Sequence, residues 1–420
     1  MAASARRYAA AMRGWVCGGL LCLSVGVGGC GDGGEAADAV GSSTTGAQSG
    51  SGSTTSADAS ASTAVGSSSG DESSSSSSGP LVDPYDGAPL DVPIDGGWHF
   101  VDIDGMACNG GVQSGVGVRR VEGSSKLVLY FKGGGACFNG TTCSLTSGLM
   151  ATGIDAIGLN PDGVLDFTRD DNPLQDYNVI YFPYCTGDVH AGTVGESSIE
   201  GTDETWNFVG HHNVLAALDR IAPTFPDPEQ LVVLGTSAGG LGALVNFPYI
   251  RAGWPQADTL LLDDSGVILP DAFLNPCLQP QLRERWGFDG LLPAGCSNCS
   301  QPDGGGLSSL FTYLPERYGD VRFAMIASDK DQILRLFYGF GNDDCASDVG
   351  VPDLGTQVYT EALSALRSER LEGRFAQFII DSETHTWSTT PAFYSTETSG
   401  VSMADWFRGV LDGDMATVAP

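Results

Sequence analysis

The motif Gly235-Thr-Ser237-Ala-Gly239 is the part of this sequence with the clearest capacity for covalent chemistry. It lies between an apolar segment of strand length, 231–234, and apolar residues at helical spacing. In that context G-x-S-x-G forms a tight turn that lifts the serine hydroxyl above the edge of a sheet, and the start of the next helix favours developing negative charge. The motif therefore predicts that Ser237 is a nucleophile. A purely structural glycine-rich turn is the alternative.

A nucleophilic serine needs a general base, and in the chain order of α/β-hydrolases the base follows the nucleophile. Of the five histidines, only His385 lies after the serine motif. It follows the apolar segment 375–380, so it should lie on a loop at the end of a strand. We therefore predict that His385 accepts the serine proton.

The acid that orients the histidine should follow a strand between the nucleophile and the base. The apolar segment 322–327 leads to two candidates, Asp329 and Asp331. Asp329 is nearer the end of the strand, so we predict Asp329 as the acid and keep Asp331 as the alternative. Asp263 and Asp264 end an earlier strand, and we expect structural roles for both.

Three consecutive glycines, 133–135, follow the apolar segment 126–131. Such a loop can bring backbone N–H groups over a nucleophile, where they stabilise the oxyanion of a tetrahedral intermediate. We predict an oxyanion hole formed by the N–H groups of Gly134, Gly135 and Ala238. Together these residues predict a serine hydrolase that works through an acyl-enzyme and needs no metal or cofactor.

The elements that must position these residues are strands and helices in alternation. Continuous apolar strands that alternate with helices are typical of a mostly parallel sheet with helices on both faces. We therefore predict an α/β class and an α/β-hydrolase domain over residues 80–420. The predicted strands are 126–131, 179–182, 231–234, 259–262, 322–327 and 375–380, and the predicted helices are 206–221 and 359–371.

Residues 1–30 have the pattern of a signal peptide with a bacterial lipobox. Three arginines precede the uncharged stretch 14–29, which is too short to span a bilayer comfortably. The stretch ends in Val27-Gly-Gly-Cys30, so we predict cleavage before Cys30 and lipidation of its thiol. An ordinary signal peptide with an incidental cysteine is the alternative.

Residues 31–79 are poor in apolar side chains, hold no aromatic residue and contain the run 73–78 of serine alone. Such a segment cannot bury enough apolar surface to offset its ordering entropy. We predict a flexible linker, with a glycosylated stalk as the alternative. The protein should then be exported, either to the cell envelope or secreted, and should reach a membrane only through the lipid anchor.

The chain carries 20 Lys and Arg against 51 Asp and Glu, which gives a formal net charge of −31. A nucleic-acid partner requires a basic face, so this charge excludes that class, and it also opposes docking on an anionic membrane. Removal of the predicted signal peptide takes away three arginines and no acid, so 17 basic residues face 51 acidic ones and the charge becomes −34. A polyanionic substrate would be repelled at long range.

Eight cysteines remain once the signal peptide and the lipidation site are set aside. An even number in an exported chain predicts up to four disulfides, which would staple loop insertions. The alternative is a metal site around Cys296-Ser-Asn-Cys299, but a single CxxC knuckle with no histidine nearby is unlike a zinc site. The eight are Cys108, Cys137, Cys143, Cys185, Cys277, Cys296, Cys299 and Cys345.

Taken together, these motifs resemble those of the pectin acetylesterase and Notum-like carboxylesterase family. The resemblance runs from about residue 126 to residue 385, and it suggests a bacterial member. The segments that carry it are 130–139 (family pattern G-G-G-W-C-x-N), 184–188 (Y-C-D-G), 235–240 (G-x-S-A-G-G), 264–266 (D-A-G) and 327–333 (A-Y-D-x-x-Q-I).

The resemblance implies an α/β-hydrolase fold, an acid at Asp329 and two disulfides, Cys108–Cys185 and Cys137–Cys143. The other four cysteines would pair among themselves. Two positions depart from the family pattern: Ala136 stands where the family has Trp, and Thr186 where it has Asp. Both positions flank the pocket mouth in relatives, so these departures bear on the choice of substrate.

The sequence therefore predicts an exported, monomeric serine carboxylesterase. Its substrate should be an acyl ester, above all an acetyl ester, of a carbohydrate such as pectin or of a small molecule. A lipase or a depolymerase of apolar polyesters is the first alternative. A catalytically silent, tethered binding protein is the second, because a fold does not imply a function.

Overall fold

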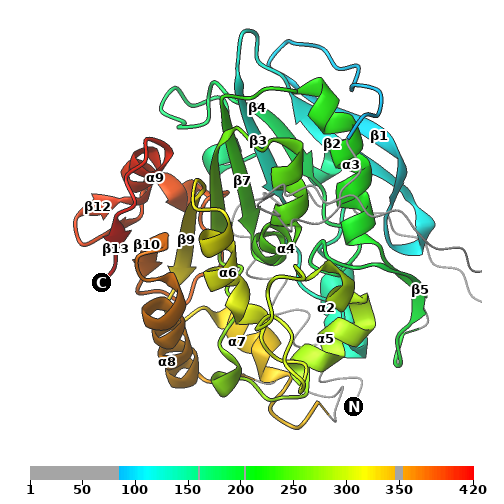
Figure 1. Cartoon of the computed structure of the whole chain (residues 1–420), viewed down its shortest axis with the longest axis vertical. Coiled ribbons are helices and arrows are strands. Elements are labelled where there is room, and N and C mark those ends of the chain that lie inside the picture. Colours follow the sequence, from blue (N-terminus) through cyan, green and yellow to red (C-terminus); the bar gives the residue numbers. More distant parts are fainter. Residues whose placement is uncertain (1–84, 159–160, 203–204, 346–352) are drawn as a thin grey trace, which may run out of the picture. The chain divides into compact units, whose positions relative to one another are not determined.

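A nine-stranded sheet forms the centre of the part of the chain that the computed structural model describes, residues 85–158, 161–202, 205–345 and 353–420 (Figure 1). The strand order is β1-β2-β4-β3-β7-β8-β9-β10-β13. From β4 to β13 in this spatial order, each strand is parallel to its neighbours. Strands β1 and β2 are antiparallel to each other, and β2 is antiparallel to β4. The predicted signal peptide, Cys30 and the predicted linker lie outside the described residues.

All six predicted strands are present in this sheet, and the α/β class is confirmed. Their residues are buried on both faces, which explains why the sequence reads as continuous apolar runs rather than alternating ones. The strands of the large sheet are β1 (Trp98–Ala107), β2 (Gln113–Arg119), β3 (Lys126–Phe131), β4 (Asn178–Phe182), β7 (Gln230–Thr236), β8 (Asp258–Asp264), β9 (Arg322–Ser328), β10 (Phe375–Ile380) and β13 (Thr417–Val418).

Two small hairpins stand beside the large sheet, β5 (Val194–Ser198) with β6 (Thr205–Phe208) and β11 (Glu397–Thr398) with β12 (Val401–Ser402). The α-helices are α2 (Gly140–Ser147), α3 (Gly210–Thr224), α4 (Ala238–Gly253), α5 (Leu278–Trp286), α6 (Leu310–Arg317), α7 (Gln332–Gly339), α8 (Thr356–Leu366) and α9 (Met403–Leu411). Among the described residues, no helix combines the length and apolar character needed to cross a membrane.

The helix predicted over 206–221 is correct only in its later part. Residues Trp206 and Phe208 belong to strand β6, and the helix begins at Gly210. These two side chains are buried on the same side of the hairpin, while Asn207 between them is half-buried. Apolar residues two positions apart fit the period of a strand, so these two residues do not belong to the helical pattern that begins at Gly210.

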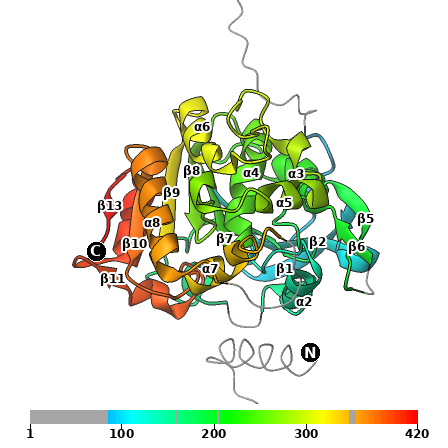
Figure 2. The same ribbon diagram turned by 90° about the horizontal axis from the view of Figure 1, so that it is seen from below.

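Apolar side chains cover both faces of the large sheet. On one face, Val128 and Ile326 share a buried cluster with Phe407 of α9. On the other face, the ring of Phe323 packs edge-on against Phe247 of α4. Figure 2 shows α3, α4 and α6 gathered on one side of the strands. The core therefore fixes the sheet as a rigid platform under the loops at its carboxyl edge.

Four disulfides staple the loops, as predicted, and they leave no cysteine of the CxxC knuckle free for a metal. Cys108–Cys185 and Cys137–Cys143 are the two pairs that the family resemblance implies. The remaining pairs are Cys277–Cys345 and Cys296–Cys299. Within the described residues, no group of three or more His, Cys, Asp or Glu side chains could hold a metal ion.

The carboxyl ends of β7, β8, β9 and β10 meet at one edge, because these four neighbours are parallel and in register. The last residues of β7 and β8, Thr236 and Asp264, are paired with each other. The loops that leave this edge carry Ser237, Asp331 and His385. Side chains separated by about 150 residues in the chain are thereby brought to one place.

Candidate active site

Ser237 occupies the sharp turn between β7 and α4. Its backbone has φ 55° and ψ −123°, a conformation that is strained for a residue other than glycine. The turn is held because the Ser237 N–H donates to the carbonyl oxygen of Asp264 at 2.7 Å. Added Cβ atoms at Gly235 and Gly239 would lie 2.1 Å and 2.0 Å from backbone oxygens, so only glycine fits at either position. The strand–turn–helix context that the motif predicts is thus present.

His385 lies on the loop after β10, and its partner is Asp331. The His385 Nδ1 atom lies 2.7 Å from Asp331 Oδ2, and the side chains are only 13 % and 1 % exposed. The other carboxylate oxygen of Asp331 caps helix α7, since it accepts the N–H groups of Ile333 and Leu334 at 2.9 Å and 3.0 Å. Helix α7 therefore holds the Asp331 carboxylate in place, and this carboxylate in turn orients the His385 imidazole.

The prediction of Asp329 as the partner of the histidine is wrong. The Asp329 N–H still donates to the carbonyl of Ile380, so this residue continues the ladder between β9 and β10. Its carboxylate accepts the Ser382 N–H at 3.3 Å and lies beside Lys330 rather than beside the imidazole. The chain turns into α7 only two residues later, and that turn points Asp331 at the base.

Nε2 of His385 is the free end of this pair. It is buried and makes no hydrogen bond to any described residue. Because Nδ1 faces a carboxylate, the tautomer with the proton on Nδ1 is favoured, and Nε2 then carries a lone pair. The side chain is thus set up to accept a proton at Nε2.

The glycine loop after β3 runs against the nucleophile turn. A Cβ added at Gly133 would lie 2.8 Å from the Cβ of Ser237 and 2.5 Å from the carbonyl oxygen of Thr236. The Gly133 N–H donates to Thr236 Oγ1 at 3.2 Å, which ties the loop to the last residue of β7. The backbone of this loop therefore passes beside Ser237 at a distance that side chains would forbid.

The three predicted oxyanion donors lie around this contact. In the described part of the chain, the N–H groups of Gly134, Gly135 and Ala238 have no hydrogen-bond acceptor. Tyr184 braces the loop, since its hydroxyl donates to the Gly135 carbonyl at 2.8 Å and its ring fills the space over Gly134. Tyr184 thus holds the loop in place, and the three N–H groups make no hydrogen bond to a described residue, which is consistent with an oxyanion hole.

His190 supports the same loop through a hydrogen bond to its first residues, a role that the sequence did not reveal. Its Nε2 atom lies 2.8 Å from the carbonyl oxygen of Lys132, and burial lowers the pKa of His190 to about 4. A neutral imidazole can donate to that carbonyl without bringing a charge into the site. No pattern in the sequence distinguishes this buried histidine from a surface one.

The neighbouring end of β8 carries two fully buried carboxyl groups. Burial raises the pKa of Asp263 to about 8 and also raises the pKa of Asp264. Asp263 Oδ1 accepts the Gly266 N–H at 2.7 Å, while its Oδ2 makes no hydrogen bond to a described residue. Asp264 is instead surrounded by hydrogen-bond donors of the loop that follows His385.

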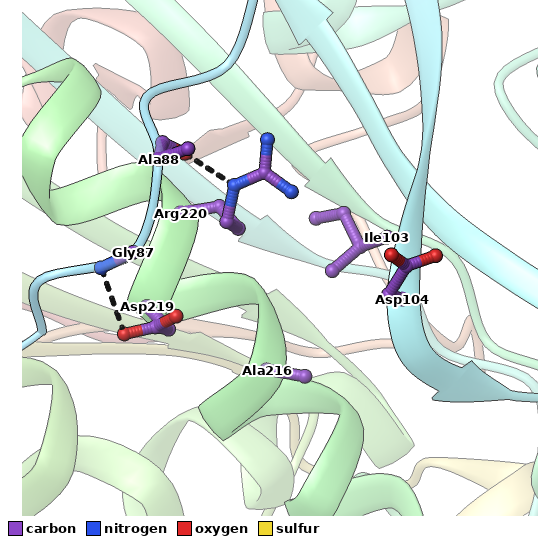
Figure 3. A pocket seen from close by; sticks show the side chains of 7 residues that line it. All are labelled: Gly87, Ala88, Ile103, Asp104, Ala216, Asp219 and Arg220. Atoms are coloured by element: carbon purple, nitrogen blue, oxygen red, sulfur yellow. Dashed lines mark hydrogen bonds between the residues drawn. The ribbon is translucent and has the colours of Figure 1, made fainter.

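A hollow of about 530 Å³ lies elsewhere on the surface, between the segment at residues 87–88, β1 and α3 (Figure 3). Its polar lining consists of Asp104, Asp219 and Arg220. Two of these side chains hold the segment in place, since Asp219 accepts the Gly87 N–H and Arg220 donates to the Ala88 carbonyl. None of the candidate catalytic residues lines it, and the hydrogen bonds at its rim anchor residues 87–88 to α3.

Comparison with known proteins agrees with this geometry. Residues 99–286 match the family model described as Pectinacetylesterase, a range that includes the glycine loop and Ser237. The palmitoleoyl-protein carboxylesterase notum2 of Xenopus laevis is 26 % identical over 160 residues, which cover 37 % of this chain and 32 % of that protein. The palmitoleoyl-protein carboxylesterase NOTUM of Drosophila melanogaster is 26 % identical over 209 residues, which cover 46 % and 31 %. The chain thus spans about a third of the length of these curated relatives.

The fold is also similar to a solved structure, that of the Wnt deacylase Notum from Drosophila. The TM-score is 0.55 at 20 % sequence identity, and the alignment covers 76 % of this chain and 95 % of the other. At this level of identity, the likeness concerns the fold alone.

Proposed function

We propose that this chain is a serine carboxylesterase of the pectinacetylesterase and Notum-like family, with the triad Ser237, His385 and Asp331, a proposal that the family match and the Notum relatives support. One observation carries the proposal: the buried His385–Asp331 hydrogen bond of 2.7 Å leaves Nε2 without a hydrogen bond to any described residue, at the sheet edge where the strained Ser237 turn lies. A carboxylate, an imidazole and a serine turn so arranged have the parts of a proton-transfer relay.

The reaction then follows from the positions of these atoms. Ser237 Oγ attacks the ester carbonyl carbon while its proton moves to His385 Nε2, and the carbonyl π electrons become the oxyanion. The imidazolium returns that proton to the departing alkoxide, which leaves as an alcohol and yields an acyl-enzyme. Water repeats the sequence, with the same Nε2 as base, and releases the carboxylic acid. Asp331 holds the tautomer and stabilises the imidazolium throughout.

The oxyanion would be stabilised by the N–H groups of Gly134, Gly135 and Ala238. Each such donor lowers the barrier by about 3 kcal/mol in comparable enzymes, because a fixed dipole needs no reorganisation during the reaction. The amino end of α4 lies directly behind Ser237 and adds its positive potential.

For the substrate, we propose acyl esters with a short chain, above all acetyl esters of a carbohydrate or a small alcohol. The family name supports acetate on pectin. The formal net charge of −31 argues against a strongly anionic polymer at low salt, so acetylated neutral glycans fit as well. Longer and more apolar acyl esters are the alternative, which the names of the palmitoleoyl-protein carboxylesterase relatives support.

The test has two parts. Ser237→Ala should abolish hydrolysis of p-nitrophenyl acetate and labelling by a fluorophosphonate probe while the circular dichroism spectrum is unchanged. Unchanged turnover would rule out the triad, and a wild-type protein that neither turns over esters nor takes the probe would indicate a silent binding protein. A series of p-nitrophenyl esters from acetate to palmitate, run beside acetate release from acetylated pectin and xylan, then identifies the acyl and alcohol classes.

We further propose that the protein is exported and tethered through Cys30, with residues 31–79 as the linker and the rest as the catalytic domain. The four disulfides support export, since such bonds persist in oxidising compartments. Expression with radiolabelled palmitate should label the wild type and leave the Cys30→Ala variant unlabelled. Equal labelling of the two would rule out this anchor.

A further inference from the structure

We propose that Asp264, at the end of β8, is a positioning residue that holds the nucleophile turn and the base loop in one geometry. The inference rests on the proposed triad and adds to it a residue that touches neither substrate nor reacting atoms. It is carried by hydrogen bonds to two parts of one residue: the backbone carbonyl of Asp264 binds the nucleophile turn, and its buried carboxylate binds the base loop.

On the nucleophile side, the backbone of Asp264 fixes the strained turn. Its carbonyl oxygen accepts the Ser237 N–H at 2.7 Å, and it is the register partner of Thr236, the residue just before the nucleophile. A residue at φ 55° keeps that conformation only where its surroundings impose it. The position of Ser237 is thus set from β8 as well as from β7.

On the base side, the carboxylate of Asp264 accepts three donors from the loop that follows His385. Its Oδ2 atom accepts the N–H of Trp387 at 2.9 Å, the N–H of Ser388 at 2.7 Å and the Ser388 hydroxyl at 2.6 Å. Charge-assisted bonds of this kind are short and directional, and the side chain is 0 % exposed. The loop behind the base is thereby fastened to the strand beside the nucleophile.

The next residue of β8 completes the clamp. Ser265 Oγ donates to Asp264 Oδ1 at 3.0 Å and accepts the Thr386 N–H at 3.2 Å. Thr386, the neighbour of His385, has φ 63°, which again needs support from its surroundings. The residue after His385 is therefore strained, and its N–H is held by Ser265, which is in turn bound to the Asp264 carboxylate.

This arrangement differs from that of the preceding residue. Asp263 is equally buried, but its one hydrogen bond to a described residue goes to the Gly266 N–H, on its own chain segment. The Asp263 carboxylate packs against Gly240, but it makes no hydrogen bond to a described residue of the nucleophile turn or of the base loop. The pair offers a comparison between a buried carboxylate that is hydrogen-bonded to the base loop and one that is not.

The test compares Asp264→Asn, Asp264→Ala and Ser265→Ala with Asp263→Asn as the control. Burst titration with p-nitrophenyl acetate counts competent sites, so kcat is expressed per titrated site. Because a misplacement of about 1 Å can cost about 100-fold in rate, we expect kcat per site to fall by up to about 100-fold in Asp264→Ala, with KM within about twofold. Asp264→Asn keeps one oxygen acceptor and should lie between Ala and wild type, while Asp263→Asn should match wild type.

A purely structural role would lower the number of titrated sites and leave kcat per site unchanged, and that result would overturn the inference. If Asp264→Ala does not fold, Asp264→Asn and Ser265→Ala decide, and wild-type kcat per site in both would overturn it equally. Ser237→Ala serves as the reference for the triad itself. Activity retained in Ser237→Ala would refute the proposed function, whereas loss there with no effect at Asp264 would refute only the positioning role.

Discussion

Asp331 and Asp329 are two residues apart, yet only the Asp331 carboxylate contacts the imidazole, at 2.7 Å. Asp331→Asn should lower kcat for p-nitrophenyl acetate by about 10⁴-fold, because an amide no longer favours the tautomer with the proton on Nδ1. Asp329→Asn is the matched control and should stay within about twofold of wild type. A larger loss in Asp329→Asn than in Asp331→Asn would contradict the assignment.

The error in the sequence interpretation has a physical origin at these two residues. Distance from the strand end favoured Asp329, but a residue that still continues the ladder directs its side chain by the pleat of the sheet, here away from the base. A second signal was present: Asp331 directly precedes the apolar-periodic segment 332–339, the place of a helix N-cap. The nucleophile turn was predictable because G-x-S-x-G encodes its own geometry.

Asp263 makes the stability of the protein depend on pH. Burial raises its pKa from an ordinary 3.8 to about 8, so the folded state binds a proton that the unfolded state has released between these two values. Stability from this group is therefore complete below about pH 4 and is lost as pH rises through about 8, at no more than about 1.4 kcal/mol per pH unit. Asp263→Asn removes the titration.

Urea unfolding at pH 5, 6, 7 and 8 measures this effect. The free energy of unfolding of the wild type should fall relative to that of Asp263→Asn as pH rises. Asp188, whose pKa burial raises to about 6, titrates in both proteins and cancels in the difference. A constant difference across the four pH values would show that Asp263 does not titrate in this range.

At the scale of elements, the glycine loop after β3 depends on the absence of a side chain at Gly133. A Cβ there would lie 2.8 Å from the Ser237 Cβ and 2.5 Å from a backbone oxygen, and neither can move freely. Gly133→Ala should therefore displace the loop, cost about 1–3 kcal/mol of stability and lower kcat by about 100-fold. The displacement separates the oxyanion donors from the nucleophile.

Gly148→Ala is the control for that variant. Gly148 ends α2 at φ −74°, and an added Cβ would have no neighbour within 4 Å. Its activity and its thermal midpoint should match those of the wild type. Wild-type kcat in Gly133→Ala would show that the loop does not supply the oxyanion donors.

How far the elements could be predicted depended on their burial. The six central strands are apolar throughout because helices or loops cover both faces, and the sequence showed them clearly. The edge strand β1 mixes exposed and half-buried positions, and its neighbour β2, though mostly buried, alternates valine with glycine, so their pairing could not be read from composition. Their place in the sheet is set by contacts with β4 and α3, which are distant in the chain.

At the scale of the whole molecule, the net charge of the chain and the name of the matching family point to different substrates. The family model that matches residues 99–286 takes its name from esters of an acidic polysaccharide, while a formal net charge of −31 repels polyanions. Local geometry says nothing about this conflict, because repulsion at long range arises from the sum of all charges. Ionic strength is the variable that separates the two contributions.

We expect the KM for acetylated pectin to fall several-fold as NaCl rises from about 10 mM to about 200 mM, since the screening length shrinks from about 30 Å to below 10 Å over that range. Acetylated xylan is neutral apart from its own substituents, so its KM should change by less than about twofold. Hydrolysis of p-nitrophenyl acetate in the same buffers controls for effects of salt on the chemical step. A KM for pectin that rises with salt would mean that local cations attract the polymer despite the net charge, and acetylated pectin would then be favoured over neutral glycans as the substrate.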